Sequence, residues 1–151
     1  MEENLEIDIL IDCSSIEASE GLFGDITIRY REIFFPTRNW NDFLVLLAEW
    51  AEKLIAFEKG EPVVDLYFID GPYRVRLSRH GCNSYVQFYF ENYPILSGVK
   101  GTRVAYYYFK QSVYKAISRV IEGHSMGLYQ IDGETTRQEV ESFEQAIQVL
   151  S

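Results

Sequence analysis

The chain has 151 residues and a mass of 17.6 kDa, the size of one ordinary domain, so we expect a single domain over residues 1–151. Hydrophobic residues make up 47% of the chain and only four residues are proline, which excludes intrinsic disorder and collagen-like repeats. No apolar run approaches the ~20 residues that span a bilayer, and the acidic start Met-Glu-Glu-Asn is unlike a signal peptide. We therefore expect a cytoplasmic protein that does not bind membranes.

The formal net charge is -9, and the acidic residues gather at the two ends of the chain. Residues 1–25 hold eight acidic residues and no basic one, whereas residues 26–131 hold ten acidic and thirteen basic residues. This distribution repels nucleic acids and anionic membranes and attracts a basic protein partner. A simpler interpretation is that the negative charge only keeps the domain soluble.

Two segments near the N-terminus alternate apolar and polar residues with a period of two. This alternation predicts half-buried β-strands over residues 5–13 and 25–30. Matching their apolar faces predicts an antiparallel hairpin whose register aligns Ile11 with Ile26, Ile9 with Ile28, and Ile7 with Tyr30.

The same register predicts which charges meet on the outer face of the hairpin. Asp8 lies opposite Arg29, and Glu6 lies opposite Arg31, which are favourable cross-strand pairs. The alternation slips at Arg31 and Glu32, which indicates a β-bulge. The acidic residues left without a partner gather at the loop end of the hairpin: Asp12, Glu17, Glu20 and Asp25.

A long amphipathic helix is predicted over residues 40–58, after Pro36 ends the preceding strand. Asn39 suits the N-cap, with Asp42 three residues later, and Gly60 follows the C-terminal end. Because the apolar face of this helix is broad, we expect the helix to pack across the sheet.

Three further strands are predicted over residues 63–70, 73–79 and 84–91, with a turn at Gly71-Pro72. Matching their alternation predicts neighbours on the inner face: Phe68 beside Val75 and Phe88, and Leu66 beside Leu77 and Val86.

The outer face of these three strands collects arginine and tyrosine side chains. Such a face can stack nucleic-acid bases, but the overall negative charge argues against that use. Arginine and tyrosine are also enriched at the centres of protein interfaces, and they can simply cover one another on a solvated sheet. The candidate contact residues on this face are Arg74, Arg76, Tyr85 and Tyr89.

Residues 103–109 fit either a strand or the first turns of a helix, and residues 110–122 predict a helix. Thr136 and Glu139 form a capping box at the start of a last helix, which ends near Leu150. This order of elements predicts an α+β domain. We expect one antiparallel sheet of about five to six strands, with a long helix after the second strand and two C-terminal helices packed on the sheet.

The sequence motifs of hydrolases, nucleotide-binding proteins and zinc metalloproteases are absent from the chain. Cys13 and Cys82 lack the C-x-x-C spacing of a zinc or redox site, and two histidines are too few for a histidine-rich metal site. We therefore expect no cofactor, no metal and no catalysis. One enzymatic hypothesis remains, with Cys82 as nucleophile and His80 or His124 as base, and a structural role in the turn is favoured over it.

Two motifs in the middle of the chain resemble those of a family of small bacterial proteins. They are FPTRNWNDF at residues 35–43, followed by Trp50, and YFIDGPYR at residues 67–74. In these motifs the chain resembles the immunity proteins of bacterial polymorphic toxin and contact-dependent growth inhibition systems.

The resemblance implies a non-catalytic cytoplasmic protein that binds the toxin domain of its own strain and blocks the active site or an adjacent surface. Many such toxins are nucleases, which implies a basic surface on the partner. The acidic residues Asp12, Glu17, Glu20 and Asp25 are then expected to steer the toxin, with Arg74, Arg76, Tyr85 and Tyr89 as the second choice of contact. A small binding or scaffold domain, homodimeric through an edge strand or the aromatic sheet face, is the main alternative.

Overall fold

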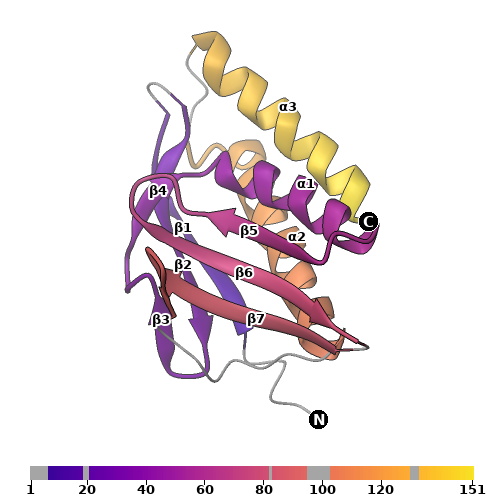
Figure 1. Ribbon diagram of the computed structural model, residues 1–151. Coiled ribbons are helices and arrows are strands. Elements are labelled where there is room, and N and C mark those ends of the chain that lie inside the picture. Colours follow the sequence, from indigo (N-terminus) through magenta and orange to yellow (C-terminus); the bar gives the residue numbers. More distant parts are fainter. Residues whose placement is uncertain (1–6, 19–20, 82, 95–102, 130–132) are drawn as a thin grey trace.

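The computed structural model describes residues 7–151 except 19–20, 82, 95–102 and 130–132, and it has the predicted α+β class (Figure 1). The strands form two antiparallel four-stranded sheets. The first sheet contains β1 (Ile7–Glu17), β2 (Phe23–Tyr30), β3 (Ile33–Phe35) and β4 (Asn41–Phe43). The second contains β5 (Val63–Tyr67), β6 (Tyr73–His80), β7 (Asn83–Phe90) and β8 (Tyr93–Pro94). The helices are α1 (Leu46–Glu58), α2 (Arg103–Ser125) and α3 (Gly133–Leu150).

The prediction of a single sheet of five to six strands is wrong, and the edges of the first sheet explain why. Strand β2 pairs with β1 along one edge. Along its other edge, β2 pairs with both β3 and β4, so neither edge of β2 is free for another strand. On the other side, α2 covers the free edge of β1. Ser112 Oγ donates to the carbonyl of Ile7 at 3.1 Å, and Arg119 donates to the carbonyl of Ile9 at 2.7 Å. The first sheet therefore offers little edge for β5–β8 to extend.

The predicted register of the first hairpin is confirmed, since Ile11 pairs with Ile26 and Ile9 with Ile28. Asp8 also lies opposite Arg29. The predicted β-bulge at Arg31 is wrong, because residues 31–32 form a tight turn between β2 and β3 in which Arg31 has a φ of 58°. The predicted pair of Glu6 with Arg31 is not tested, because Glu6 lies outside the described residues.

The predicted start of the first helix at residue 40 is wrong, because α1 begins at Leu46. Residues 41–43 instead form β4, which pairs with Phe23–Asp25 of β2. Asn39 has a φ of 57° and does not cap a helix. The backbone pairing of this segment with β2 thus prevails over the local capping pattern.

In the second sheet, the predicted pairing of β6 with β7 is confirmed, since Val75 faces Phe88 and Leu77 faces Val86. The predicted register of β5 is wrong by two residues, because Leu66 rather than Phe68 lies opposite Val75. The Phe68 N–H donates to the carbonyl of Tyr73 at 3.0 Å, so residues 68–72 belong to the turn and not to the strand. Phe68 still faces the core, since a shift of two residues keeps the face.

Two helices, α2 and α3, follow β8. Residues 103–109, which fit a strand or a helix in the sequence, form the first turns of α2. The predicted capping box at Thr136 and Glu139 is wrong, because α3 begins at Gly133. Thr136 therefore lies inside the helix, where it is fully buried. Glu139 instead accepts a hydrogen bond from the Leu22 N–H at 2.8 Å, which ties α3 to the start of β2.

The core lies between the two sheets and the helices. Phe35 of β3 stacks on Phe88 of β7 with ring centroids 4.8 Å apart, so the sheets meet through aromatic packing. Helix α2 contacts β1 and β7, and α1 contacts β5 and α3, as the arrangement in Figure 1 shows. Within the described residues, no helix is long and apolar enough to cross a membrane.

Candidate functional site

Asp12 and Asp25 lie directly opposite each other on β1 and β2. The register shifts beyond this pair, up to the pairing of Glu17 with Phe23. Two serines hold the irregular segment: Ser14 donates from its N–H and its Oγ to Asp12 Oδ1 at 3.0 and 2.6 Å, and Ser15 Oγ accepts from the Asp25 N–H at 2.8 Å. Neither carboxylate forms an ion pair with another described residue. Like charges in opposite positions destabilise a sheet, so this pair is costly to the free protein.

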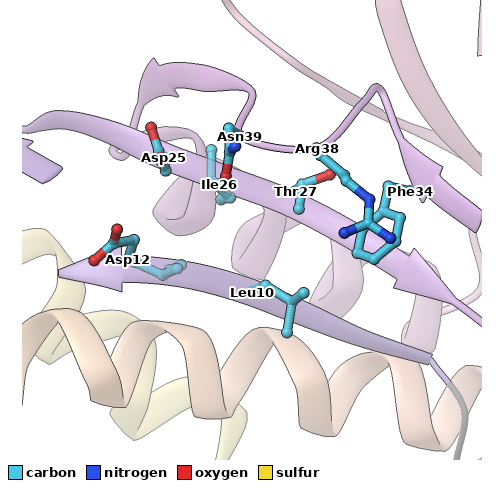
Figure 2. A pocket seen from close by; sticks show the side chains of 9 residues that line it. Leu10, Asp12, Asp25, Ile26, Thr27, Phe34, Arg38 and Asn39 are labelled. Carbon is cyan, nitrogen blue, oxygen red and sulfur yellow. The ribbon is translucent and has the colours of Figure 1, made fainter.

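The two carboxylates border a hollow of about 390 Å³ on the outer face of the first sheet. Figure 2 shows Asp12 and Asp25 toward one end of the hollow and Arg38 beside Phe34 toward the other. The Arg38 guanidinium lies 4.1 Å from the centre of the Phe34 ring, which is a cation–π contact. Leu10 contributes apolar wall between the two ends. The hollow therefore offers an anionic end, an apolar middle and a cationic end.

The structure describes only one of the other two predicted steering acids. Glu17 is exposed at the end of β1 and is not among the residues that line the hollow. Glu20 lies outside the described residues. Of the four predicted acids, the structure thus brings Asp12 and Asp25 together.

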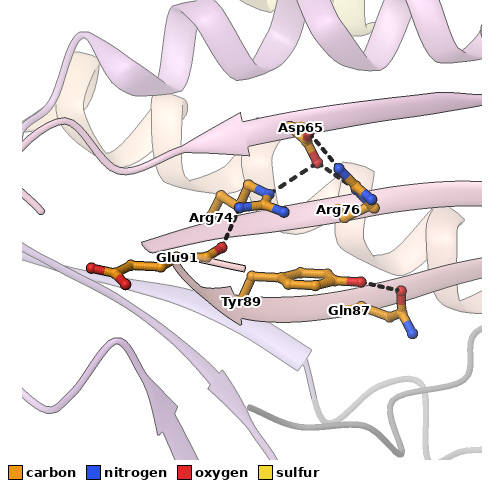
Figure 3. Close-up of polar contacts among 6 residues, drawn as sticks. All are labelled: Asp65, Arg74, Arg76, Gln87, Tyr89 and Glu91. Atoms are coloured by element: carbon orange, nitrogen blue, oxygen red, sulfur yellow. Dashed lines mark hydrogen bonds and ion pairs between the residues drawn. The ribbon is translucent and has the colours of Figure 1, made fainter. Parts of the chain in front are cut away.

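The second predicted contact face lies on the outer side of the second sheet and centres on Asp65 of β5 (Figure 3). Arg76 Nε and the Arg76 terminal nitrogen donate to the two oxygens of Asp65 at 2.9 and 3.0 Å. Arg74 Nε lies 3.5 Å from the same carboxylate, a distance typical of an ionic contact more than of a hydrogen bond. Burial acts to raise the pKa of Asp65, but the hydrogen bonds and charge of Arg76, with the charge of Arg74, hold this pKa below its ordinary value.

Tyr89 completes this face. The Arg74 and Arg76 guanidinium groups lie 4.5 and 5.3 Å from the centre of its ring, and its hydroxyl donates to Gln87 at 3.2 Å. Arg74 also donates to the carbonyl of Glu91. Tyr85, the fourth predicted residue, is half-buried on β7. The structure brings the predicted Arg–Tyr face together, but the charges of both arginines are already engaged within it.

The sequence interpretation missed the most deeply buried acid among the described residues, Asp42, which it placed at a helix start. The side chain of Asp42 is fully buried and lies between β4 and the turn that follows β5. The period-two alternation of Trp40, Asp42 and Leu44 is the signal that could have found it, since alternation indicates one shared face of a strand.

The cysteines give no support to a nucleophile within the described residues. Burial and the neighbouring Asp12 raise the pKa of the Cys13 thiol, which disfavours the reactive thiolate. Cys82, the nucleophile of the less favoured enzymatic hypothesis, lies outside the described residues, so that hypothesis is not tested. In the described part of the chain, no three His, Cys, Asp or Glu side chains are grouped closely enough to hold a metal ion.

Comparison of the chain with family models, curated proteins and solved structures finds no match. The resemblance to immunity proteins therefore stays a prediction that depends on the two motifs alone.

Proposed function

We propose that this chain is a non-catalytic immunity protein that binds a basic toxin domain through the outer face of its first sheet. One observation carries the proposal: Asp12 and Asp25 face each other at an open hollow with no cationic partner among the described residues. The resemblance in the two motifs supports the choice of a toxin as the partner.

Repulsion between the two carboxylates explains how binding would gain free energy. A lysine or arginine of the toxin that enters the hollow between Asp12 and Asp25 adds two attractive contacts, which offset the repulsion between the two carboxylates. Apolar parts of the same side chain would lie along Leu10 and Phe34. The net charge of -9 adds long-range attraction toward a basic surface and raises the rate of encounter.

The Arg–Tyr face of the second sheet is the second choice for the contact. It is rigid, because Asp65 and Tyr89 hold Arg74 and Arg76 in place. Rigid tyrosine and arginine side chains suit a protein interface. However, the arginines would have to exchange existing ionic contacts for new ones, so this face gains less from a charged partner than the Asp12–Asp25 hollow.

The proposal predicts that a basic toxin domain is encoded beside the gene of this chain. The test uses that domain, in an active form for inhibition and an inactivated form for calorimetry. We expect an equimolar complex and loss of toxin activity. A variant with Asp12→Asn and Asp25→Asn keeps the oxygen that accepts from Ser14 and should bind at least about 10-fold more weakly.

The matched control changes the net charge equally with Glu141→Gln and Glu144→Gln, two exposed positions on α3. This control should bind like the unmodified protein. If no complex forms and the toxin keeps its full activity, the proposed function is wrong. Light scattering of the chain alone would then test the homodimeric alternative. Equal weakening by both variants would place the contact elsewhere on the surface.

A further inference from the structure

A second hollow, of about 150 Å³, lies where β1 and β2 meet α2. Its wall includes three basic side chains, Arg29, Lys115 and Arg119, and one acidic side chain, Asp8. In a chain with a net charge of -9, such a local excess of positive charge is unusual and needs a physical reason.

Asp8, the acidic residue that lines this hollow in the described part of the chain, is already engaged. Asp8 Oδ1 accepts from the Ile9 N–H at 2.8 Å, and its other oxygen lies 3.8 Å from Arg119. Arg119 also donates to the carbonyl of Ile9 at 2.7 Å. Asp8 thus pairs with Arg119, and it also lies opposite Arg29 across the two strands. Neither Arg29 nor Lys115 forms an ion pair with a described residue, so the three basic side chains exceed the one described acid of the hollow by two positive charges.

Arg29 provides the second, independent observation. Its Nε atom is buried, and no acceptor for its N–H exists among the described residues. Buried N–H groups are nearly always hydrogen-bonded, and a charged one is especially costly without an acceptor. An oxyanion in the adjoining hollow would supply the missing negative charge, and it would also supply the acceptor once the Arg29 side chain turns its N–H toward the hollow.

The size of the hollow restricts the ligand. Pockets for drug-sized molecules begin at roughly 300 Å³, so this one is too small for a nucleotide. Tyr108 also lines the hollow. We propose that this hollow binds a single phosphate-type oxyanion, held by Arg29, Lys115 and Arg119, independently of the toxin interface.

The test is calorimetric titration of the full chain with inorganic phosphate, against sodium chloride at equal ionic strength. We expect saturable binding of phosphate and a rise in the melting temperature that chloride does not reproduce. Arg29→Gln should weaken phosphate binding about 10-fold or more, because it removes a charge-assisted hydrogen bond.

Two further variants keep the test decisive. Lys115 is exposed, so Lys115→Gln is expected to fold and should also weaken phosphate binding, even if Arg29→Gln does not fold. Lys53→Gln, at an exposed position on α1, removes the same charge far from the hollow and should leave phosphate binding unchanged. The inference is overturned if phosphate acts only as salt, or if Lys115→Gln and Lys53→Gln bind phosphate equally well.

Discussion

The carboxylate of Asp42 accepts hydrogen bonds from the backbone N–H of Asp70 at 3.1 and 3.2 Å and so links the two sheets of the fold. The same carboxylate accepts from the Ile69 N–H at 3.1 Å and from Trp40 Nε1 at 2.9 Å. It is fully buried and forms no ion pair with any other described residue. The two motifs that carry the family resemblance therefore meet at one side chain, which gives these residues a structural role.

Replacing this buried carboxylate should destabilise the protein strongly. Asp42→Asn keeps one acceptor oxygen but turns an N–H₂ group toward backbone donors, so we expect a loss of about 3 kcal/mol in the free energy of unfolding. Urea denaturation measures this loss. Asp70→Asn changes an exposed side chain in the same turn and should stay within about 0.5 kcal/mol of the unmodified protein. Equal effects of the two changes would contradict the structural role of Asp42.

Gly71 is required for close packing at the same place. A Cβ atom at this position would lie 2.9 Å from the Trp40 ring, which is closer than atoms normally approach. Gly71→Ala should therefore cost about 1–3 kcal/mol. In a Trp40→Phe background the smaller ring makes room, and the cost of Gly71→Ala should fall. A double-mutant cycle without coupling would show that the two residues do not restrict each other.

The ionic cluster around Asp65 predicts a dependence of stability on pH. The pKa of Asp65 is lower in the folded chain than in the unfolded chain, so the ionised carboxylate stabilises the fold above about pH 4. This contribution disappears as the pH falls through the folded-state pKa. Asp65→Asn should thus lower the free energy of unfolding at pH 7, and the difference from the unmodified protein should shrink toward pH 2. A difference that stays constant over this range would contradict the prediction.

Asp25 should limit the stability of the free protein, as expected for a residue kept for binding. Asp25→Asn removes the repulsion from Asp12, so we expect an increase of roughly 0.5 kcal/mol in the free energy of unfolding. The same change should weaken binding of the basic domain. A loss of stability on this substitution would indicate that Asp25 serves the fold instead.

Much of the first hairpin could be predicted because its strands bury one face. A slip of one residue would turn Ile9 and Ile28 toward solvent, so the alternation determines the register. The opposition of Asp12 and Asp25 follows directly from that register. A slip of two residues preserves every face, and for that reason the register of Leu66 against Val75 could not be obtained from alternation alone.

The rest of the site depends on contacts between distant segments. Arg38 reaches the hollow because the segment that leads into β4 runs beside β2. The helix-capping pattern around Asn39 predicted a helix there instead. Similarly, nothing in the sequence around Arg29 indicates that α2 would bring Lys115 and Arg119 beside it. Such placements depend on tertiary packing, which local sequence patterns do not predict.

The rate of association with the basic domain, measured by stopped flow at increasing salt concentration, tests whether the Asp12–Asp25 hollow is the contact site. For the unmodified chain and the Glu141→Gln, Glu144→Gln control, we expect a fast rate that falls steeply with salt. The Asp12→Asn, Asp25→Asn variant should associate more slowly, depend less on salt and dissociate faster. If this variant associates and dissociates like the control, the Asp12–Asp25 hollow is not the contact site.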